Sequence, residues 1–151
     1  MYRLETEIEI SASPERVWSL LLDFPAYPRW NPFIRSIEGA PVVGHTLNVV
    51  IQPPGSRGMR FRPTVLAVAP HRELRWKGKL FVPGLFDGEH YLRLEPRPAG
   101  RLIFRHGEMF SGLLVPVLRR SLDGSTRHGF VAMNEAVKRE AEKMRPGESL
   151  R

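Results

Sequence analysis

The stretch Tyr27-Pro28-Arg29-Trp30-Asn31-Pro32-Phe33 divides the chain into a short N-terminal part and a longer part rich in strand patterns. Proline has a fixed φ angle and no amide hydrogen, so the prolines here predict that neither a helix nor a strand runs through the stretch. Its aromatic rings carry a large apolar surface that must be buried. We therefore expect a linker that folds Tyr27, Trp30 and Phe33 inward and borders a hydrophobic cavity.

The residues before this linker predict one strand and one short helix. Over residues 2–11, apolar side chains alternate with charged ones, which is typical of a half-buried strand. Ser13 then suits the N-cap of a helix, and Pro14 suits its first turn. Pro25 ends this short helical region just before the linker.

The residues after the linker predict a run of strands and one long helix. Turn signals rich in glycine and proline separate six candidate strands, at about 34–40, 44–52, 59–69, 72–81, 87–97 and 101–110. Several of these alternate with period two, which predicts an antiparallel meander with one apolar face and one wet, basic face. Apolar residues recur at steps of three and four over about 113–144, which indicates a helix. Asp123-Gly124 is expected to weaken or kink its middle.

A sheet with one apolar face needs a cover, and the long C-terminal helix is the only long element available. The sheet of about seven strands is strongly twisted, so one helix cannot fill its concave side. The linker and the short N-terminal helix close part of the remaining space. The sequence therefore predicts an α+β fold with a tunnel or pocket between sheet and helix.

Length and composition limit the number of domains and the kinds of cofactor and partner that are expected. With 151 residues, the chain is expected to form a single domain over 1–144 with a flexible tail at 145–151. There is no cysteine, and the five histidines lack zinc-type spacing, so neither a metal nor any other cofactor is expected. The net charge of +7 comes from scattered basic residues, so nucleic acid is not an expected partner. No membrane insertion and a cytoplasmic location are expected, because neither a spanning segment nor a signal peptide is visible.

Polar residues on the apolar face are the chemical signal in this sequence. The alternation places His90, His106 and Glu108 among inward leucines and phenylalanines. An ionisable group in such a place is costly unless it is paired. Residues that share a face lie opposite one another in an antiparallel pair, so His90 should face His106 or Glu108. A His–Glu pair is then within reach.

Three interpretations of that pair stay open. The pair could satisfy itself and fix the register of its hairpin. It could line a pocket and bind a hydroxyl or carbonyl group of a ligand. It could also act as acid and base in an aldol-type cyclisation or a dehydration, with His90 and Glu108 as the catalytic residues. Trp76 also faces inward, and it is either a wall residue of the pocket or an ordinary core residue. The apolar segment 81–86 could form a lid, a tip that contacts a membrane, or a bent strand.

The chain also resembles a known superfamily, SRPBCC, which has the START-like or Bet v 1-like helix-grip fold. Its polyketide cyclase/dehydrase-like branch of small bacterial proteins is the nearest in pattern. The resemblance rests on Ile8-Glu9-Ile10-Ser11-Ala12-Ser13-Pro14-Glu15-Arg16-Val17-Trp18, Trp30-Asn31-Pro32-Phe33, Gly88-Glu89-His90-Tyr91-Leu92, Glu108-Met109-Phe110-Ser111-Gly112 and Gly129-Phe130-Val131-Ala132-Met133-Asn134. It implies a curved antiparallel sheet gripping the long helix, with the first strand beside the last.

The superfamily implies more than one function, because it includes lipid carriers, cyclases, chaperone cofactors and hormone receptors. The first hypothesis is a module that binds a hydrophobic small molecule, such as a lipid, polyketide or isoprenoid. The second is a cyclase or dehydratase that uses the His/Glu pair, and the third is a protein-interaction module. Whether the chain is an enzyme, and its oligomeric state, are left open. The expected ligand-binding residues are Trp30, Phe33, Trp76, His90, Phe104, His106, Glu108, Phe110 and Met133.

Overall fold

The computed structural model describes residues 1–80 and 82–143, and its elements follow the predicted order. The helical elements are α1 (Pro14–Leu22), a 3₁₀ turn (Phe24–Ala26), α2 (Tyr27–Trp30), α3 (Val115–Ser121), a π-helical turn (Leu122–Thr126) and α4 (Arg127–Glu142). The strands are β1 (Tyr2–Ile10), β2 (Ile34–Glu38), β3 (Asn48–Ile51), β4 (Met59–Phe61), β5 (Thr64–Ala69), β6 (Glu73–Lys79), β7 (Asp87–Arg97) and β8 (Arg101–Ser111). The predicted tail at 145–151 lies outside the described residues, and the single-domain extent stays a prediction.

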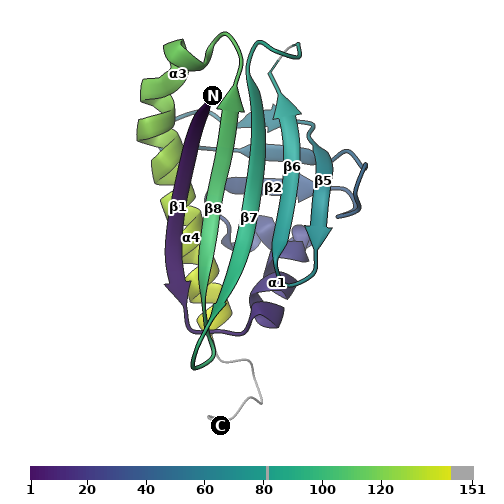
Figure 1. Cartoon of the computed structure of the whole chain (residues 1–151), viewed down its shortest axis with the longest axis vertical. Coiled ribbons are helices and arrows are strands. Elements are labelled where there is room, and N and C mark those ends of the chain that lie inside the picture. Colours follow the sequence, from purple (N-terminus) through teal and green to yellow (C-terminus); the bar gives the residue numbers. More distant parts are fainter. Residues whose placement is uncertain (81, 144–151) are drawn as a thin grey trace.

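Two antiparallel sheets and one long helical segment form the helix-grip architecture (Figure 1). The larger sheet has five strands in the order β1-β8-β7-β6-β5, and the smaller has three in the order β2-β3-β4. Figure 1 shows the smaller sheet behind the larger one, with its strands running crosswise, and the α3–α4 segment along one side. The first strand pairs with the last over its whole length, from Tyr2 opposite Phe110 to Ile10 opposite Leu102. The expectation that the first strand lies beside the last is therefore confirmed.

One predicted strand is in fact two. The range 59–69 divides at Arg62-Pro63 into β4, which joins the smaller sheet, and β5, which joins the larger one. Pro63 has no amide hydrogen to donate to a ladder, so a continuous strand is interrupted there. The division allows the two sheets to take different directions. An isolated bridge between Thr46 and Thr64 connects the start of β5 to the segment before β3.

The linker differs from its prediction in one respect. We expected no regular element in it, but a single helical turn, α2, forms with Pro28 in its first turn, where the missing amide hydrogen has no intrahelical role. Asn31 ends this turn, and its Oδ1 atom accepts hydrogen bonds from the main-chain amides of Phe33 and Ile34, each at 2.9 Å. This arrangement directs the chain into β2. The three aromatic rings of the linker are all buried, as expected.

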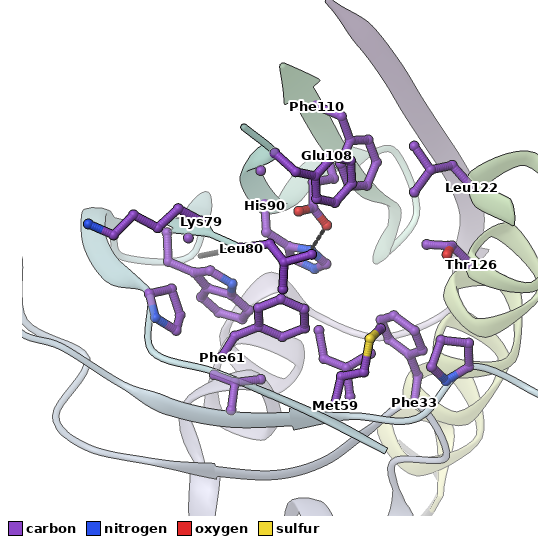
Figure 2. Close-up of a pocket in the computed structure, with 18 residues that line it drawn as sticks. Phe33, Met59, Phe61, Lys79, Leu80, His90, Glu108, Phe110, Leu122 and Thr126 are labelled. Atoms are coloured by element: carbon purple, nitrogen blue, oxygen red, sulfur yellow. Dashed lines mark hydrogen bonds and ion pairs between the residues drawn. The ribbon is translucent and has the colours of Figure 1, made fainter. Parts of the chain in front are cut away.

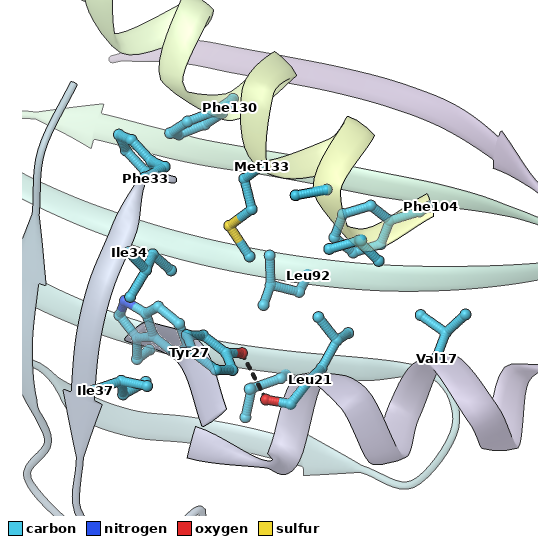
Figure 3. Packing of buried hydrophobic residues seen from close by; sticks show 14 of the residues in the cluster. Val17, Leu21, Tyr27, Phe33, Ile34, Ile37, Leu92, Phe104, Phe130 and Met133 are labelled. Atoms are coloured by element: carbon cyan, nitrogen blue, oxygen red, sulfur yellow. Dashed lines mark hydrogen bonds between the residues drawn. The ribbon is translucent and has the colours of Figure 1, made fainter. Parts of the chain in front are cut away.

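The C-terminal segment is helical from Val115 to Glu142, with a π-helical turn in the middle. The π turn contains Asp123-Gly124, the position where a weak point was predicted. Its helical face packs Phe130 against Phe33 with ring centroids 5.3 Å apart (Figure 3). Gly129 makes this approach possible, because a Cβ atom at that position would overlap the Phe33 ring.

The outer face of the larger sheet is not the basic surface that we expected. Arg75 pairs with Glu73 and Glu89, each at 3.1 Å, and Arg105 pairs with Glu95 at 2.7 Å. Acidic residues on the same strand or on a neighbouring strand thus neutralise these arginines. Within the described part of the chain, no helix is long and apolar enough to cross a membrane.

Candidate functional site

A small cavity lies between the two sheets and the helical segment. Its volume is about 100 Å³, and most of its wall is apolar. Figure 2 shows Phe33 and Met59 on one side of the space, Glu108 and Phe110 on the opposite side, and Leu122 and Thr126 extending from the helix. The residues that line it are Phe33, Val49, Ile51, Pro53, Met59, Phe61, Pro63, Trp76, Gly78, Lys79, Leu80, Phe86, Gly88, His90, Glu108, Phe110, Leu122 and Thr126.

The structure brings five of the nine expected ligand-binding residues to the cavity wall. These five are Phe33, Trp76, His90, Glu108 and Phe110. The other four do not line the cavity, and the structure places them in the packed interior: Trp30, Phe104, His106 and Met133. The cavity therefore occupies one end of the space that the sequence analysis expected to be hollow, and the remainder is filled by core side chains such as those in Figure 3.

The polar feature of the wall is a contact between an imidazole and a carboxylate. Residues 90 and 108 are directly opposite in the β7–β8 ladder, which is one of the two pairings that the alternation allowed. The Nδ1 atom of His90 lies 2.9 Å from Oε1 of Glu108, and the dashed line in Figure 2 marks this contact. The His90 side chain is 2% exposed and that of Glu108 is 17% exposed. The carboxylate thus lies at the boundary between the interior and the cavity.

Gly88 provides the space for that carboxylate. The other carboxylate oxygen, Oε2 of Glu108, lies over Gly88, where any Cβ atom would overlap it. Gly88 itself lines the cavity. The second oxygen of Glu108 is therefore held on the cavity side, while the first contacts His90.

Aromatic rings fix the orientation of His90. The Trp76 ring stacks on it, with centroids 5.0 Å apart and planes 3° from parallel. The Phe130 ring meets it edge-on at 5.3 Å. The indole therefore covers one face of the imidazole, whose two nitrogen atoms are free to contact other side chains.

Behind His90, a hydrogen-bond chain continues into the core. The Nε2 atoms of His90 and His106 lie 2.9 Å apart, and Nδ1 of His106 lies 2.9 Å from Oδ1 of Asn134 on α4. The Asn134 amide nitrogen then donates to Oγ1 of Thr6 on β1 at 2.8 Å. Thr6 in turn donates to the main-chain carbonyl of His106 at 3.0 Å. Five side chains from three strands and one helix are therefore connected.

The environment of His106 disfavours its charged form. Complete burial, and then the charge of the neighbouring His90, hold the pKa of His106 well below its usual range. Hydrogen bonds with Asn134 and with the main chain of Phe130 act in the opposite direction but are weaker. His106 is therefore neutral at neutral pH.

Sequence reasoning missed Thr6 and Asn134. Both carried a signal, because Thr6 falls in the inward series of the first strand, and Asn134 falls four residues after Phe130 on the apolar helix face. It also missed the cavity residues of β4 and of the π turn. The β4 residues were assigned to one long strand, which hid their turn toward the second sheet. Among the described residues, no group of three or more histidine or acidic side chains is arranged so that it could hold a metal ion.

The segment 81–86 was expected to be a lid, a tip or a bent strand. Phe81 lies outside the described residues, while Val82 is 58% exposed. Phe86 turns inward, lines the cavity and stacks on Phe110 with centroids 5.4 Å apart. The described part of this segment thus contributes one wall ring and one exposed apolar side chain.

Comparison with known proteins agrees with this architecture. A family model described as "Polyketide cyclase / dehydrase and lipid transport" matches residues 1–144. No curated protein matches the chain significantly.

Several solved structures share the fold. A protein from Mesorhizobium loti has a TM-score of 0.72 at 25% identity, with 95% of this chain and 100% of that one covered. A START superfamily protein from Mycobacterium smegmatis has a TM-score of 0.68 at 18% identity, with 93% and 99% covered. The di-domain ARO/CYC protein StfQ, from the steffimycin biosynthetic pathway, has a TM-score of 0.74 at 12% identity, with 93% of this chain and 50% of that chain covered.

Proposed function

Since this chain belongs to the polyketide cyclase / dehydrase and lipid transport family, we propose that its cavity binds a small apolar molecule that carries an oxygen group. The observation that supports this most directly is an apolar cavity with one imidazole–carboxylate pair on its wall. Apolar walls provide the affinity of such a site, and a few polar groups provide its orientation.

The size of the cavity supports a ligand, or a part of a ligand, no larger than one ring. A volume of about 100 Å³ is close to that of a cavity that accepts benzene, roughly 150 Å³, and well below the ~300 Å³ or more of sites for drug-sized molecules. A lipid, polyketide or isoprenoid, the classes expected from the sequence, would therefore place one ring or one chain end here.

The polar anchor of the proposed site is Glu108. Figure 2 shows the ammonium group of Lys79 directed away from the middle of the cavity, and Thr126 on the helix, apart from the strand wall that carries Glu108. An oxygen group of a ligand that lies against the β7–β8 wall would therefore meet the Glu108 carboxylate first.

A titration with toluene and with p-cresol tests this proposal. Both contain one ring, and we expect both to shift the amide resonances of cavity residues in two-dimensional NMR spectra. Glu135→Gln, an exposed change on α4, is the matched control for Glu108→Gln and should bind both compounds as the wild type does. If neither compound shifts these resonances, and native mass spectrometry of the purified protein finds no apolar adduct, the proposed function is wrong.

A second candidate function is catalysis of a cyclisation or dehydration, and the His90–Glu108 pair favours it. In a dehydration, Glu108 would take the α-proton of a β-hydroxyketone and a C=C bond would form as the Cβ–O bond breaks. The hydroxyl group would leave as water with a proton returned by the His90–Glu108 pair. A phenyl-substituted β-hydroxyketone is a suitable probe, because its conjugated product absorbs in the ultraviolet. Turnover that Glu108→Gln abolishes while binding is kept would establish this function, and no turnover by the wild type would contradict it.

A further inference from the structure

The buried hydrogen-bond chain has a direction, and we infer that this direction makes the cavity select ligands with a hydroxyl donor over their ether or carbonyl counterparts. The inference rests on the proposed function only in that a ligand must enter the cavity. Its basis is the order of donors and acceptors from Thr6 through Asn134, His106 and His90 to Glu108.

Thr6 fixes the direction at the buried end. Its hydroxyl contacts the main-chain carbonyl of His106, and a carbonyl oxygen can only accept, so the single hydroxyl hydrogen points there. The Oγ1 atom must then accept from Asn134, which places the amide nitrogen of Asn134 toward Thr6 and its oxygen toward His106. The amide oxygen can only accept as well. Nδ1 of His106 therefore carries a hydrogen.

The same reasoning determines which nitrogen atoms of the two imidazoles carry a hydrogen. A neutral His106 with a hydrogen on Nδ1 has a lone pair on Nε2, so Nε2 of His90 must donate to it across 2.9 Å. A positive charge on His106 would reverse this contact, but that ring is fully buried and no carboxylate contacts it among the described residues. The charge is more stable on His90, which adjoins the Glu108 carboxylate. The depressed pKa of His106 agrees with this order.

A single proton then lies between His90 and Glu108. Without it, the Nδ1 lone pair would face a carboxylate oxygen at 2.9 Å, which is repulsive. The proton belongs either to the imidazole, giving an ion pair, or to Oε1 of the carboxyl group, giving a neutral pair. The sum of the charges is zero in both forms, which suits a site that is largely closed to water.

In both forms the second oxygen of Glu108 has no hydrogen. This atom, Oε2, lies over Gly88 on the cavity side, so the cavity meets a hydrogen-bond acceptor wherever the shared proton resides. A hydroxyl or phenol group can donate to it. An ether or carbonyl oxygen at the same place would set lone pair against lone pair and leave the carboxylate oxygen without a partner.

The first experiment compares p-cresol with 4-methylanisole, which keeps the ring and the oxygen but lacks the donor hydrogen. Because one hydrogen bond to a carboxyl group is involved, we expect p-cresol to bind about tenfold tighter or more. Equal affinities for the two would overturn this inference while leaving the proposed function intact. Binding of neither compound, nor of toluene, would instead contradict the proposed function.

The second experiment determines the direction of the hydrogen-bond chain without any ligand. The ¹⁵N resonances of the two imidazoles in the full-length wild type should show a hydrogen on Nδ1 of His106 and on Nε2 of His90. Thr6→Ser keeps the hydroxyl and should preserve these tautomers, whereas Thr6→Val should disturb the His106 signals. A hydrogen on Nε2 of His106 in the wild type would show that the hydrogen-bond chain has the opposite direction. That result would refute the inference even if Thr6→Val failed to fold.

Discussion

The ring of Trp76 stacks on that of His90 with centroids 5.0 Å apart and planes 3° from parallel. The two residues are directly opposite in the β6–β7 ladder, so the sheet register itself creates the stack. One face of the imidazole is covered in this way, and its rotation about χ2 is restricted. We expect the contact between His90 and Glu108 to depend on that restriction.

Replacement of Trp76 tests how much the stack contributes. Trp76→Ala removes a large buried ring and should lower the free energy of unfolding by about 3–5 kcal/mol, measured by urea denaturation. Trp76→Phe keeps a ring to cover His90 and should cost clearly less. Equal losses for the two variants would show that a phenyl ring over His90 contributes no measurable stability at this position.

Gly88→Ala should separate the polar pair. The added Cβ atom would overlap the Glu108 carboxylate, and since a glutamate side chain is flexible, the carboxylate should move rather than the strand. We expect shifted His90 imidazole resonances and weaker p-cresol binding. Gly78 lies opposite Gly88 in the ladder, and a Cβ atom there has ordinary contact with Pro63 at 3.6 Å, so Gly78→Ala should leave the His90 resonances in place.

The buried His106 predicts a pH dependence of stability. Its pKa in the folded protein lies below the value of about 6.5 in an unfolded chain. Below that pH the unfolded state binds more protons at this residue, so stability should fall as the pH decreases, by at most about 1.4 kcal/mol per pH unit. The full contribution is present above pH ~6.5. Urea denaturation between pH 7 and 5 measures the slope.

A variant without His106 isolates the contribution of this residue to the pH dependence of stability. His90 contacts His106, and Glu108 contacts His90, so these groups can also contribute to the slope. The wild-type slope must therefore be compared with that of His106→Gln, which should be flatter over the same pH range. The paired carboxylates with lowered pKa act in a separate window, below about pH 4.5, where stability also falls with pH; they are Glu5, Glu73, Glu95 and Glu142. An unchanged slope in His106→Gln would disprove the assignment.

Two glycines of the C-terminal helical segment should respond oppositely to alanine. At Gly129 a Cβ atom would overlap the Phe33 ring, and such overpacking typically costs about 1–3 kcal/mol, more than the helix propensity of alanine returns. At Gly124 no atom lies within 4 Å of the added Cβ. Gly124→Ala should therefore raise thermal stability slightly. A stabilising Gly129→Ala would mean that helix and linker are not tightly packed.

The sequence predicted correctly those features that a local residue pattern determines. Period-two alternation placed His90 and Glu108 on one face, and an antiparallel ladder leaves them opposite each other. The helical periodicity and the weak point at Asp123-Gly124 were equally local, and the structure has both. These features required no knowledge of long-range packing.

The remaining features depend on contacts between distant segments. On the outer face, Glu89 pairs with Arg75 and Glu95 pairs with Arg105 from a neighbouring strand, so alternation alone could not identify these pairs. The extent of the cavity depended on how far Met133 and Phe104 fill the space beneath the helix. Thr6 and Asn134 are separated by most of the chain, and their connection became visible only with the fold.

The division at Pro63 has a consequence for how such a protein can change. Met59 and Phe61 of β4 form the wall on the side of the smaller sheet, whereas the polar pair belongs to β7 and β8 of the larger one. The dimensions of the cavity and its chemistry are thus encoded in separate stretches of the gene. Substitutions in the short strand can retune which shapes are admitted while the proton-bearing pair is inherited intact.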